Sequence, residues 1–378
     1  MTTFSLMDIE MNLFPDDRQG IITDLVQRMD QAEKEKKDKF HFLNDRDVLH
    51  YFLYRNTNLN EAANRSDRTI REYELELEQM IRNLLQYAEE IGLDIEDVVE
   101  GSLFKSLSPR HVRRYQMWLT ESSPYVKENG PYSPATLSRK TVVLKSFFRF
   151  LFEKRYITEP LHDSLLTSTV RKDDRPNRDL GPSEVIQLLD YFHDAGNPIV
   201  FSLIHVLVGT GLRNDELCRL KMSDVRFDPI LGGFYLHVIG KGNKERDIPL
   251  KEKVMDSLIL YRKARFLSAA FPVGSDEPLL PNSRHMAFRP SYFSTFLGNA
   301  IEKVPIRSIQ ARTSRITPHV FRHSFAIISY VSGANIYDIM RALGHEQIDT
   351  TMIYLQKIMD REQHAIHKWN QDTLGRYI

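Results

Sequence analysis

Apolar side chains recur with a helical period of about 3.6 residues over most of the chain. Before residue 169 this spacing predicts five helices, at residues 18–39, 45–54, 66–91, 108–120 and 133–155. Two of the starts are well marked, because Ser108 and Ser133 each place a capping side chain directly before a proline that suits the first helical turn. The pattern predicts no strand in this part of the chain.

The helix predicted at 133–155 has two distinct faces. Phe147 and Leu151 belong to a set of apolar side chains that can pack inward, whereas Arg139 and Lys140 lie in a set that stays polar. Phosphate groups are the natural partner of a basic helical face. We therefore expect Arg139 and Lys140 to bind DNA.

The apolar period is lost between residues 169 and 182, where prolines, a glycine and many charges predict a linker between two domains. Beyond it the pattern is again helical, with one interruption. Residues 233–239 and 246–250 read as a strand pair around the turn KGNKE. The predicted organisation is an N-terminal extension of unknown role at 1–44, a helical domain at 45–168, a linker at 169–182 and a second domain with a C-terminal tail at 183–378.

Composition narrows the class of protein. A chain of 378 residues is long enough for two ordinary cores, and its 42% apolar and 27% charged residues are typical of soluble globular proteins. No apolar run approaches the roughly 20 residues of a membrane span. The N-terminal stretch is acidic where a signal peptide would be basic, and Cys218 is the only cysteine. We expect a soluble protein of the reducing cytoplasm, without a membrane partner.

Charge is distributed unevenly along the chain, although the formal net charge is zero. The first hundred residues contain 12 Lys and Arg against 23 Asp and Glu, which leaves 39 and 28 of the 51 of each kind for the remainder. The two parts therefore carry formal charges of −11 and +11. A basic body that faces DNA would show this asymmetry, and so would a wholly solvated surface.

Four short segments place basic or proton-handling side chains at helix starts or tight turns. They are TGLRNDEL with Arg213 and Glu216, IGKGNKERDIPL with Lys241 and Lys244, TPHVFRHSFA with His319 and Arg322, and LGHEQIDTTMIY with His345 and Tyr354. In the last segment Gly344 is expected to end one helix, and Asp349 or Thr350 to cap the next.

Each segment taken alone also has an ordinary structural explanation. An Arg-Glu pair three residues apart is usually a surface ion pair, a hairpin lysine is usually solvated, and a tyrosine in an apolar stretch is usually core. A zinc site at His319, His323 and His345 is disfavoured, because no acidic or thiolate ligand stands at ligand spacing with them. We expect no metal.

In this order, the arginine, lysine, HxxR, histidine and tyrosine resemble the catalytic domain of the tyrosine recombinase, or phage integrase, family, most closely its Xer-type and integrase branch. The resemblance covers residues 178–356, and the helices at 66–155 resemble the family's core-binding domain more loosely. It implies a mainly α fold with a small β-sheet: a helical, SAM-like N-terminal core-binding domain followed by an α+β catalytic domain.

The resemblance also implies a reaction in which duplex DNA is cut and rejoined at specific sites through a 3′-phosphotyrosine, with no metal, ATP or other cofactor. The roles fall on particular residues: Tyr354 as nucleophile, Arg213 and Arg322 as phosphate clamp, His319 as base, Lys241 as acid, His345 as hydrogen-bond donor and Glu216 as the residue that orients Arg213 or its neighbours. Lys244 is the main rival to Lys241 and a further candidate for DNA binding. The family often has Ile-Ser where this chain has Asn214 and Asp215, so Asp215 leaves the local ion pairing open.

The partners implied are duplex DNA at recombination sites, a homo-tetramer on two duplexes, and an accessory protein or second recombinase, in a cytoplasmic, nucleoid-associated setting. Two other classes stay open, a catalytically inactive DNA-binding regulator and a type IB topoisomerase. The tail after Tyr354 keeps an apolar pattern and packs either on its own subunit or on a neighbour. Neither the target site nor the choice between dimer resolution and mobile-element integration follows from the sequence.

Overall fold

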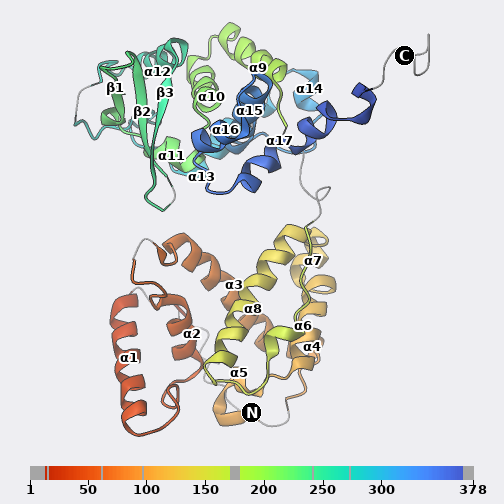
Figure 1. The fold of residues 1–378 in the computed structure, drawn as a ribbon. Coiled ribbons are helices and arrows are strands. Elements are labelled where there is room, and N and C mark those ends of the chain that lie inside the picture. Colours follow the sequence, from red (N-terminus) through yellow and green to blue (C-terminus); the bar gives the residue numbers. More distant parts are fainter. Residues whose placement is uncertain are drawn as a thin grey trace. The chain divides into compact units, whose positions relative to one another are not determined.

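The computed structural model describes residues 13–14, 17–60, 63–95, 98–170, 179–240, 242–271 and 274–368. Contacts within the chain divide it into two compact units, Met1–Arg175 (unit 1) and Pro176–Ile378 (unit 2), each with its own hydrophobic core (Figure 1). The division falls inside the stretch 169–182. No helix in the described ranges is long and apolar enough to cross a membrane.

All the regular elements among the described residues of unit 1 are helices. Its elements are α1 (Arg18–Lys34), α2 (Asp45–Tyr54), α3 (Asp67–Gln86), α4 (Ala88–Ile91), η2 (Val99–Gly101), α5 (Leu103–Ser106), α6 (Pro109–Glu121), α7 (Pro124–Asn129), α8 (Pro134–Glu153) and η3 (Leu161–Ser164). The helix predicted at 66–91 is two helices that meet at Tyr87. At the start of α8 the Ser133 hydroxyl accepts a hydrogen bond from the backbone N–H of Thr136 at 3.2 Å, which confirms the predicted cap.

The core of unit 1 forms where α8 contacts α2, α3 and η3. Phe147 and Leu151 of α8 are fully buried, as their spacing predicts. Helix α1 belongs to the same core, because its Leu25 and Met29 are buried with side chains from the other helices. Residues assigned to an N-terminal extension thus contribute to the packing of the first unit.

Unit 2 combines helices with a three-stranded sheet. Its elements are α9 (Pro182–Asp194), α10 (Pro198–Thr210), α11 (Asn214–Arg219), η5 (Met222–Asp224), β1 (Val225–Phe227), β2 (Phe234–Ile239), β3 (Glu245–Leu250), α12 (Glu252–Ala264), α13 (Pro290–Glu302), α14 (Arg307–Gln310), α15 (Pro318–Val331), α16 (Ile336–Leu343), α17 (Ile348–Glu362) and η6 (Ala365–Lys368). Helix α10 lies against α9, α12 and α15, as Figure 1 shows. The mainly α fold with a small sheet is confirmed.

The sheet is antiparallel in the order β1-β2-β3. Leu236 of β2 pairs with Val225 of β1 and with Ile248 of β3, and all three side chains are buried. Strands β2 and β3 are the predicted pair, whereas β1 was not predicted because three residues are too few to show an alternating pattern.

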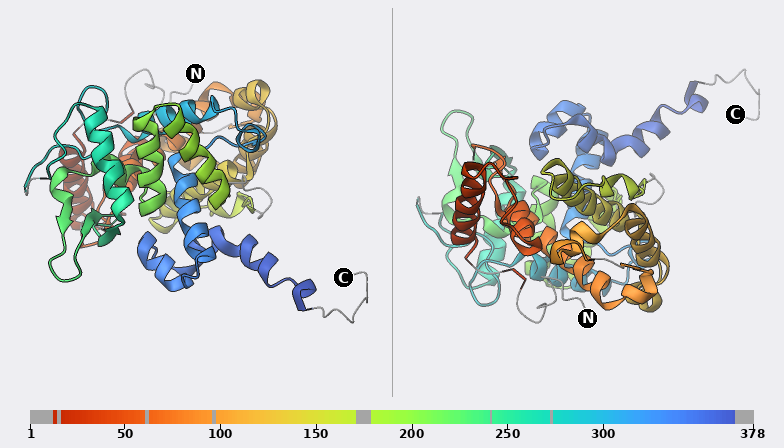
Figure 2. Two further views of the ribbon diagram at one scale, coloured as in Figure 1. Left: turned by 90° about the horizontal axis from the view of Figure 1, so that it is seen from above. Right: turned by 90° about the horizontal axis from the view of Figure 1, so that it is seen from below.

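Helices α15, α16 and α17 enclose a small core of their own, which includes Ile327, Leu343 and Leu355. Gly344 ends α16 in the left-handed conformation, as expected. Helix α17 begins at Ile348 after Gln347, so the prediction that Asp349 or Thr350 caps it is wrong, and both residues lie in its first turn. Figure 2 shows the C-terminal end of α17 extending away from the other helices of unit 2. Residues 369–378 of the tail lie outside the described residues.

Candidate active site

A tight turn after α10 positions the first arginine. Gly211 has a positive φ of 62°, and a Cβ atom there would come within 2.8 Å of the Phe325 ring, so only glycine fits. The turn places Arg213 at the N-cap of α11, with its side chain 29% exposed. The guanidinium is therefore anchored at a helix start while part of it remains accessible.

Glu216 is the carboxylate at the centre of the site, and its side chain is fully buried. It accepts hydrogen bonds from the backbone N–H and Nη1 of Arg213, both at 2.8 Å, and from Nη1 and Nη2 of Arg246 in β3, at 3.0 and 2.7 Å. Burial raises the pKa of Glu216, but the bonds to Arg246 and Arg213 outweigh burial and lower it to about 2. The carboxylate is thus charged at neutral pH and holds two arginines.

Arg322 of α15 is the second predicted clamp arginine and is 1% exposed. Its Nη1 donates to the carbonyl oxygen of Gly211 at 2.7 Å, and its Nη2 donates to the carbonyl oxygen of Leu343. Burial, followed by the positive charge of Arg213, lowers the pKa of Arg322 to about 10. The group stays charged at neutral pH, and this concentrated positive charge makes the site attractive to an anion.

His345, directly after the end of α16, is buried against Arg322. Its Nε2 lies 3.0 Å from Nη2 of Arg322, and its Nδ1 lies 2.8 Å from the hydroxyl of Thr351. Burial, then the charges of Arg322 and Arg213, lower the pKa of His345 to about 4, so the imidazole is neutral at pH 7. Because an arginine only donates, Nε2 must accept, and the single ring proton lies on Nδ1 and is donated to Thr351.

Tyr354 of α17 lies among three histidine rings and is 7% exposed. The centroid of its ring is 3.9 Å from that of His323, 5.5 Å from that of His345 and 6.1 Å from that of His319. His319 itself is exposed, at the N-terminal turn of α15. Three of the four segments identified in the sequence thus contribute Arg213, Arg322, His319, His345 and Tyr354 to one place in unit 2.

The lysines of the β2–β3 hairpin are less completely described. Lys241 lies outside the described residues. Lys244 is exposed and forms an ion pair with Glu346, the residue that follows His345. Asp215 pairs with Arg219 one helical turn later at 3.1 Å, so it does not enter the arginine cluster.

Of the basic residues predicted to lie on an exposed face of α8, Arg139 is exposed and Lys140 is not. Lys140 is 6% exposed, and its Nζ forms an ion pair with Glu76 of α3 at 2.8 Å. The prediction of an exposed Lys140 is wrong, because its charge is buried and neutralised within unit 1. Arg139 keeps the position expected of it.

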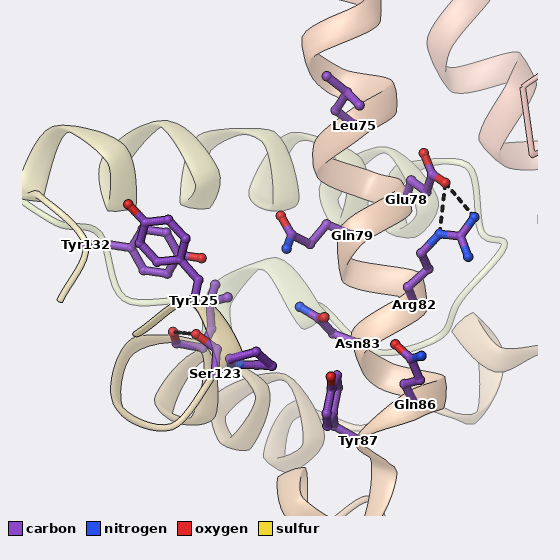
Figure 3. A pocket seen from close by; sticks show the side chains of 12 residues that line it. Leu75, Glu78, Gln79, Arg82, Asn83, Gln86, Tyr87, Ser123, Tyr125 and Tyr132 are labelled. Atoms are coloured by element: carbon purple, nitrogen blue, oxygen red, sulfur yellow. Dashed lines mark hydrogen bonds and ion pairs between the residues drawn. The ribbon is translucent and has the colours of Figure 1, made fainter. Parts of the chain in front are cut away.

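A groove of about 610 Å³ on unit 1 is separate from these residues. Figure 3 shows the stacked rings of Tyr125 and Tyr132 at one end, 4.3 Å apart between centroids, and the ion pair of Glu78 with Arg82 at the other. None of the predicted catalytic residues lines this groove.

Comparison with known proteins shows which family the chain resembles. Residues 178–361 match the model of the phage integrase family. The chain is 30% identical over 241 residues to the tyrosine recombinase XerC of Bacillus licheniformis, an alignment that covers 61% of this chain and 74% of that protein. The chain belongs to the tyrosine recombinase family. XerC of Halalkalibacterium halodurans is 29% identical over 328 residues, covering 84% of this chain and 95% of the relative.

Solved structures of tyrosine recombinases share the fold at lower identity. A XerH recombinase bound to a palindromic difH substrate matches with a TM-score of 0.57 and 18% identity, covering 93% of this chain and 91% of that one. A lambda integrase dimer bound to a COC′ core site matches with a TM-score of 0.55 and 15% identity, covering 77% and 89%. This tyrosine recombinase is thus a site-specific DNA recombinase, an enzyme that cleaves and rejoins DNA.

Two site residues of this recombinase were not identified from the sequence, although each carried a signal. Arg246 lies two residues before the buried Ile248, so the period of a strand puts it on the inward face. Thr351 lies three residues before Tyr354, so both share one face of α17. The motifs were interpreted as residues that contact the phosphate, and neither Arg246 nor Thr351 is expected to do so.

Proposed function

We propose that Tyr354 is the nucleophile and that the residues around it perform one cleavage and rejoining reaction on a DNA phosphodiester. The observation that carries this proposal is the position of His345, which contacts both the buried guanidinium of Arg322 and the ring of Tyr354. The guanidinium of Arg322 can bind a phosphate group and the oxygen of Tyr354 can attack it, and only the His345 side chain lies between them.

Arg213 and Arg322 bind the non-bridging oxygens of the scissile phosphate. Three guanidinium groups surround a single carboxylate here, those of Arg213, Arg246 and Arg322 around Glu216, so the cluster carries an excess of positive charge. A phosphodiester under attack gains negative charge on those oxygens, and planar guanidinium forks suit it well. Glu216 orients Arg213 through both of its bonds to that residue.

His345 donates to the same phosphate after its proton changes position. In the DNA-free protein its Nε2 accepts from Arg322, so it has no proton to offer there. When Arg322 turns its donors to the phosphate, the Thr351 hydroxyl, which can donate as well as accept, stabilises the other tautomer. Nε2–H then points to the phosphate.

The covalent step forms one bond and breaks another. The Tyr354 oxygen attacks phosphorus and loses its proton to His319, while the DNA 5′-oxygen leaves with a proton from Lys241. The 3′-phosphotyrosine keeps the energy of the broken bond, and attack by a second 5′-hydroxyl reverses the step. Strand exchange follows when that hydroxyl belongs to another duplex.

We further propose that the enzyme acts as a tetramer on two duplexes, with an accessory protein or second recombinase as an additional partner. Exchange between two duplexes cuts four strands, and each cut uses one Tyr354, so the reaction needs four copies of the chain. Arg139, exposed on α8, is proposed to contact the DNA backbone in unit 1, and Lys244 in unit 2.

The decisive test uses a nicked suicide substrate, which traps the covalent intermediate. Tyr354→Phe loses only the hydroxyl, so DNA binding should stay within about twofold of the wild type while the denaturant-resistant adduct disappears. An adduct that persists in the Phe variant would place the nucleophile elsewhere, with Tyr330 and Tyr337 examined next.

The same substrates separate this proposal from the two alternative classes. A regulator without catalysis traps no DNA. A topoisomerase relaxes supercoils but does not exchange strands between two differently labelled duplexes. We expect trapping and exchange, and sequencing the DNA trapped in the native host would reveal the target site.

A further inference from the structure

The C-terminal end of α16 gathers the arginines of the site. Three consecutive carbonyl oxygens there, those of its last two residues and of the C-cap Gly344, each accept a hydrogen bond from a different guanidinium: Ala342 from Nε of Arg246 at 3.1 Å, Leu343 from Nη2 of Arg322, and Gly344 from Nη2 of Arg213 at 3.3 Å. The last carbonyls of a helix have no partner within the helix, and they form its negative end. Three cations are therefore held side by side at one helix terminus.

Arg246 differs from the other two arginines in how its donors are used. Both Nη atoms donate to Glu216 and Nε donates to Ala342, so each of its three nitrogens already has a partner in the protein. Its side chain is 12% exposed, against 29% for Arg213. It is thus placed to hold its neighbours and poorly placed to reach DNA.

Through these bonds Arg246 connects three elements of unit 2. It belongs to β3, it binds the carboxylate that holds Arg213 at the start of α11, and it binds α16 two carbonyls before Gly344. Its side-chain atoms also lie 3.4 Å from where a Cβ atom on Gly344 would be, so it packs against the turn that leads into His345.

We infer that Arg246 is a positioning residue of the cleavage reaction, which fixes Glu216 and the end of α16 so that Arg213 and His345 face the same phosphate. The inference rests on the proposed function, because it assigns Arg246 to the support of that site. Arg246 itself does not touch DNA in this arrangement.

Loss of Arg246 has a consequence that depends on pH. Glu216 faces the charges of Arg213, Arg246 and Arg322, and its pKa of about 2 depends on Arg246 more than on any other partner. Without Arg246 the same burial would raise this pKa. Glu216 would then be protonated at a higher pH than in the wild type, and Arg213 would lose its charged anchor as the pH falls.

The test measures single-turnover cleavage and half-site binding for the full chain. Arg246→Gln should slow cleavage by roughly 10- to 100-fold at pH 7.5, the effect of losing a hydrogen bond to a charged group. Its half-site Kd should stay within about twofold of the wild type. Arg246→Lys keeps the charge with fewer hydrogen-bond donors, so its cleavage rate should lie between those of the wild type and Arg246→Gln. Arg226→Gln removes an exposed charge from β1 of the same sheet and should match the wild type.

Two further readouts exclude a merely structural effect. The rate of Arg246→Gln relative to wild type should fall further from pH 8 to pH 5, and adding Glu216→Gln should abolish that additional fall. A substrate whose bridging 5′-oxygen is sulfur, a better leaving group, should not rescue Arg246→Gln selectively, because the defect lies in phosphate positioning.

Several outcomes would overturn the inference. They are unchanged cleavage in Arg246→Gln, a loss of DNA affinity as large as the loss of rate, a constant rate ratio across pH, or selective rescue by the sulfur substrate. Tyr354→Phe, run beside these variants, separates the two proposals: an adduct formed by that variant refutes the assignment of the nucleophile, whereas the Arg246 comparisons still report whether this residue supports cleavage.

Discussion

The buried ion pair between Lys140 and Glu76 predicts that one substitution on α8 destabilises unit 1 without a direct effect on DNA binding. The two side chains are 7% and 9% exposed and lie 2.8 Å apart. Lys140→Met keeps the aliphatic packing but leaves the Glu76 carboxylate buried without its cation. Lys140 also lies 5.3 Å from the centre of the Tyr132 ring, a contact that this substitution removes as well.

The expected magnitude follows from the burial of both partners. Breaking a buried pair by removing one partner costs about 3–5 kcal/mol, whereas replacing both by apolar side chains is often neutral or stabilising. Lys140→Met should therefore lower the free energy of unfolding of unit 1 by about 3 kcal/mol or more. Lys140→Met combined with Glu76→Leu should recover most of that loss. Arg139→Gln, at the exposed neighbour, should change it by no more than about 0.5 kcal/mol.

Tryptophan fluorescence can follow unit 1 alone. The chain has two tryptophans, and Trp118 is buried in the core of unit 1. In a Trp369→Phe background, urea unfolding monitored by Trp118 reports the stability of this unit within the full chain. If Lys140→Met costs less than about 1 kcal/mol, or if the double variant is no more stable than the single one, the pair does not have the buried character described here. Lys140 would then return to the residues proposed to bind DNA, and a smaller salt dependence of binding would show it.

Two further predictions concern the chemistry. Thr351→Val keeps the shape of the side chain but removes the hydrogen-bond partner of His345 Nδ1. Cleavage should therefore slow by roughly 5- to 10-fold, the effect of about one neutral hydrogen bond, while the rate of Thr351→Ser stays near that of the wild type. Equal cleavage rates for the Val and Ser variants would show that Thr351 does not control the tautomer of His345. Lys241→Ala should slow cleavage strongly on the natural substrate and recover on the substrate with a sulfur leaving group, because that substrate does not need an acid. Lys244→Ala removes a proposed DNA contact rather than the acid, so the sulfur substrate should not rescue it selectively, and selective rescue of Lys244→Ala instead would transfer the role of acid to it.

The elements and the reacting groups could be predicted because each has a local signal. Leu25, Phe147 and Leu151 occupy the inward positions that a helical period assigns to them. Arg322 and Tyr354 belong to short motifs, which can be recognised from the spacing of residues along the sequence. The three-residue strand β1 was missed because it is too short for any period to show.

Pairings between distant residues could not be predicted in the same way. Lys140 looks like a member of a basic face until Glu76, 64 residues earlier, is placed beside it. Likewise, Arg246 finds Glu216 across 30 residues, and nothing in either local segment fixes that partnership. Burial and ion pairing depend on how the whole chain packs, whereas a sequence pattern indicates only which side chains can take part in them.

The shared anchor at the end of α16 also determines how the site can fail. Because three guanidinium groups are attached to consecutive carbonyls at the end of one short helix, two in its last turn and one at its C-cap, a shift or fraying of that turn displaces all three at once. The phosphate pocket then behaves as a cooperative unit, assembled or dismantled as a whole. Substitutions in α16 outside the motifs, such as at the buried Ile339, would thus affect catalysis by a common route, with a loss of rate that follows the local stability of this helix.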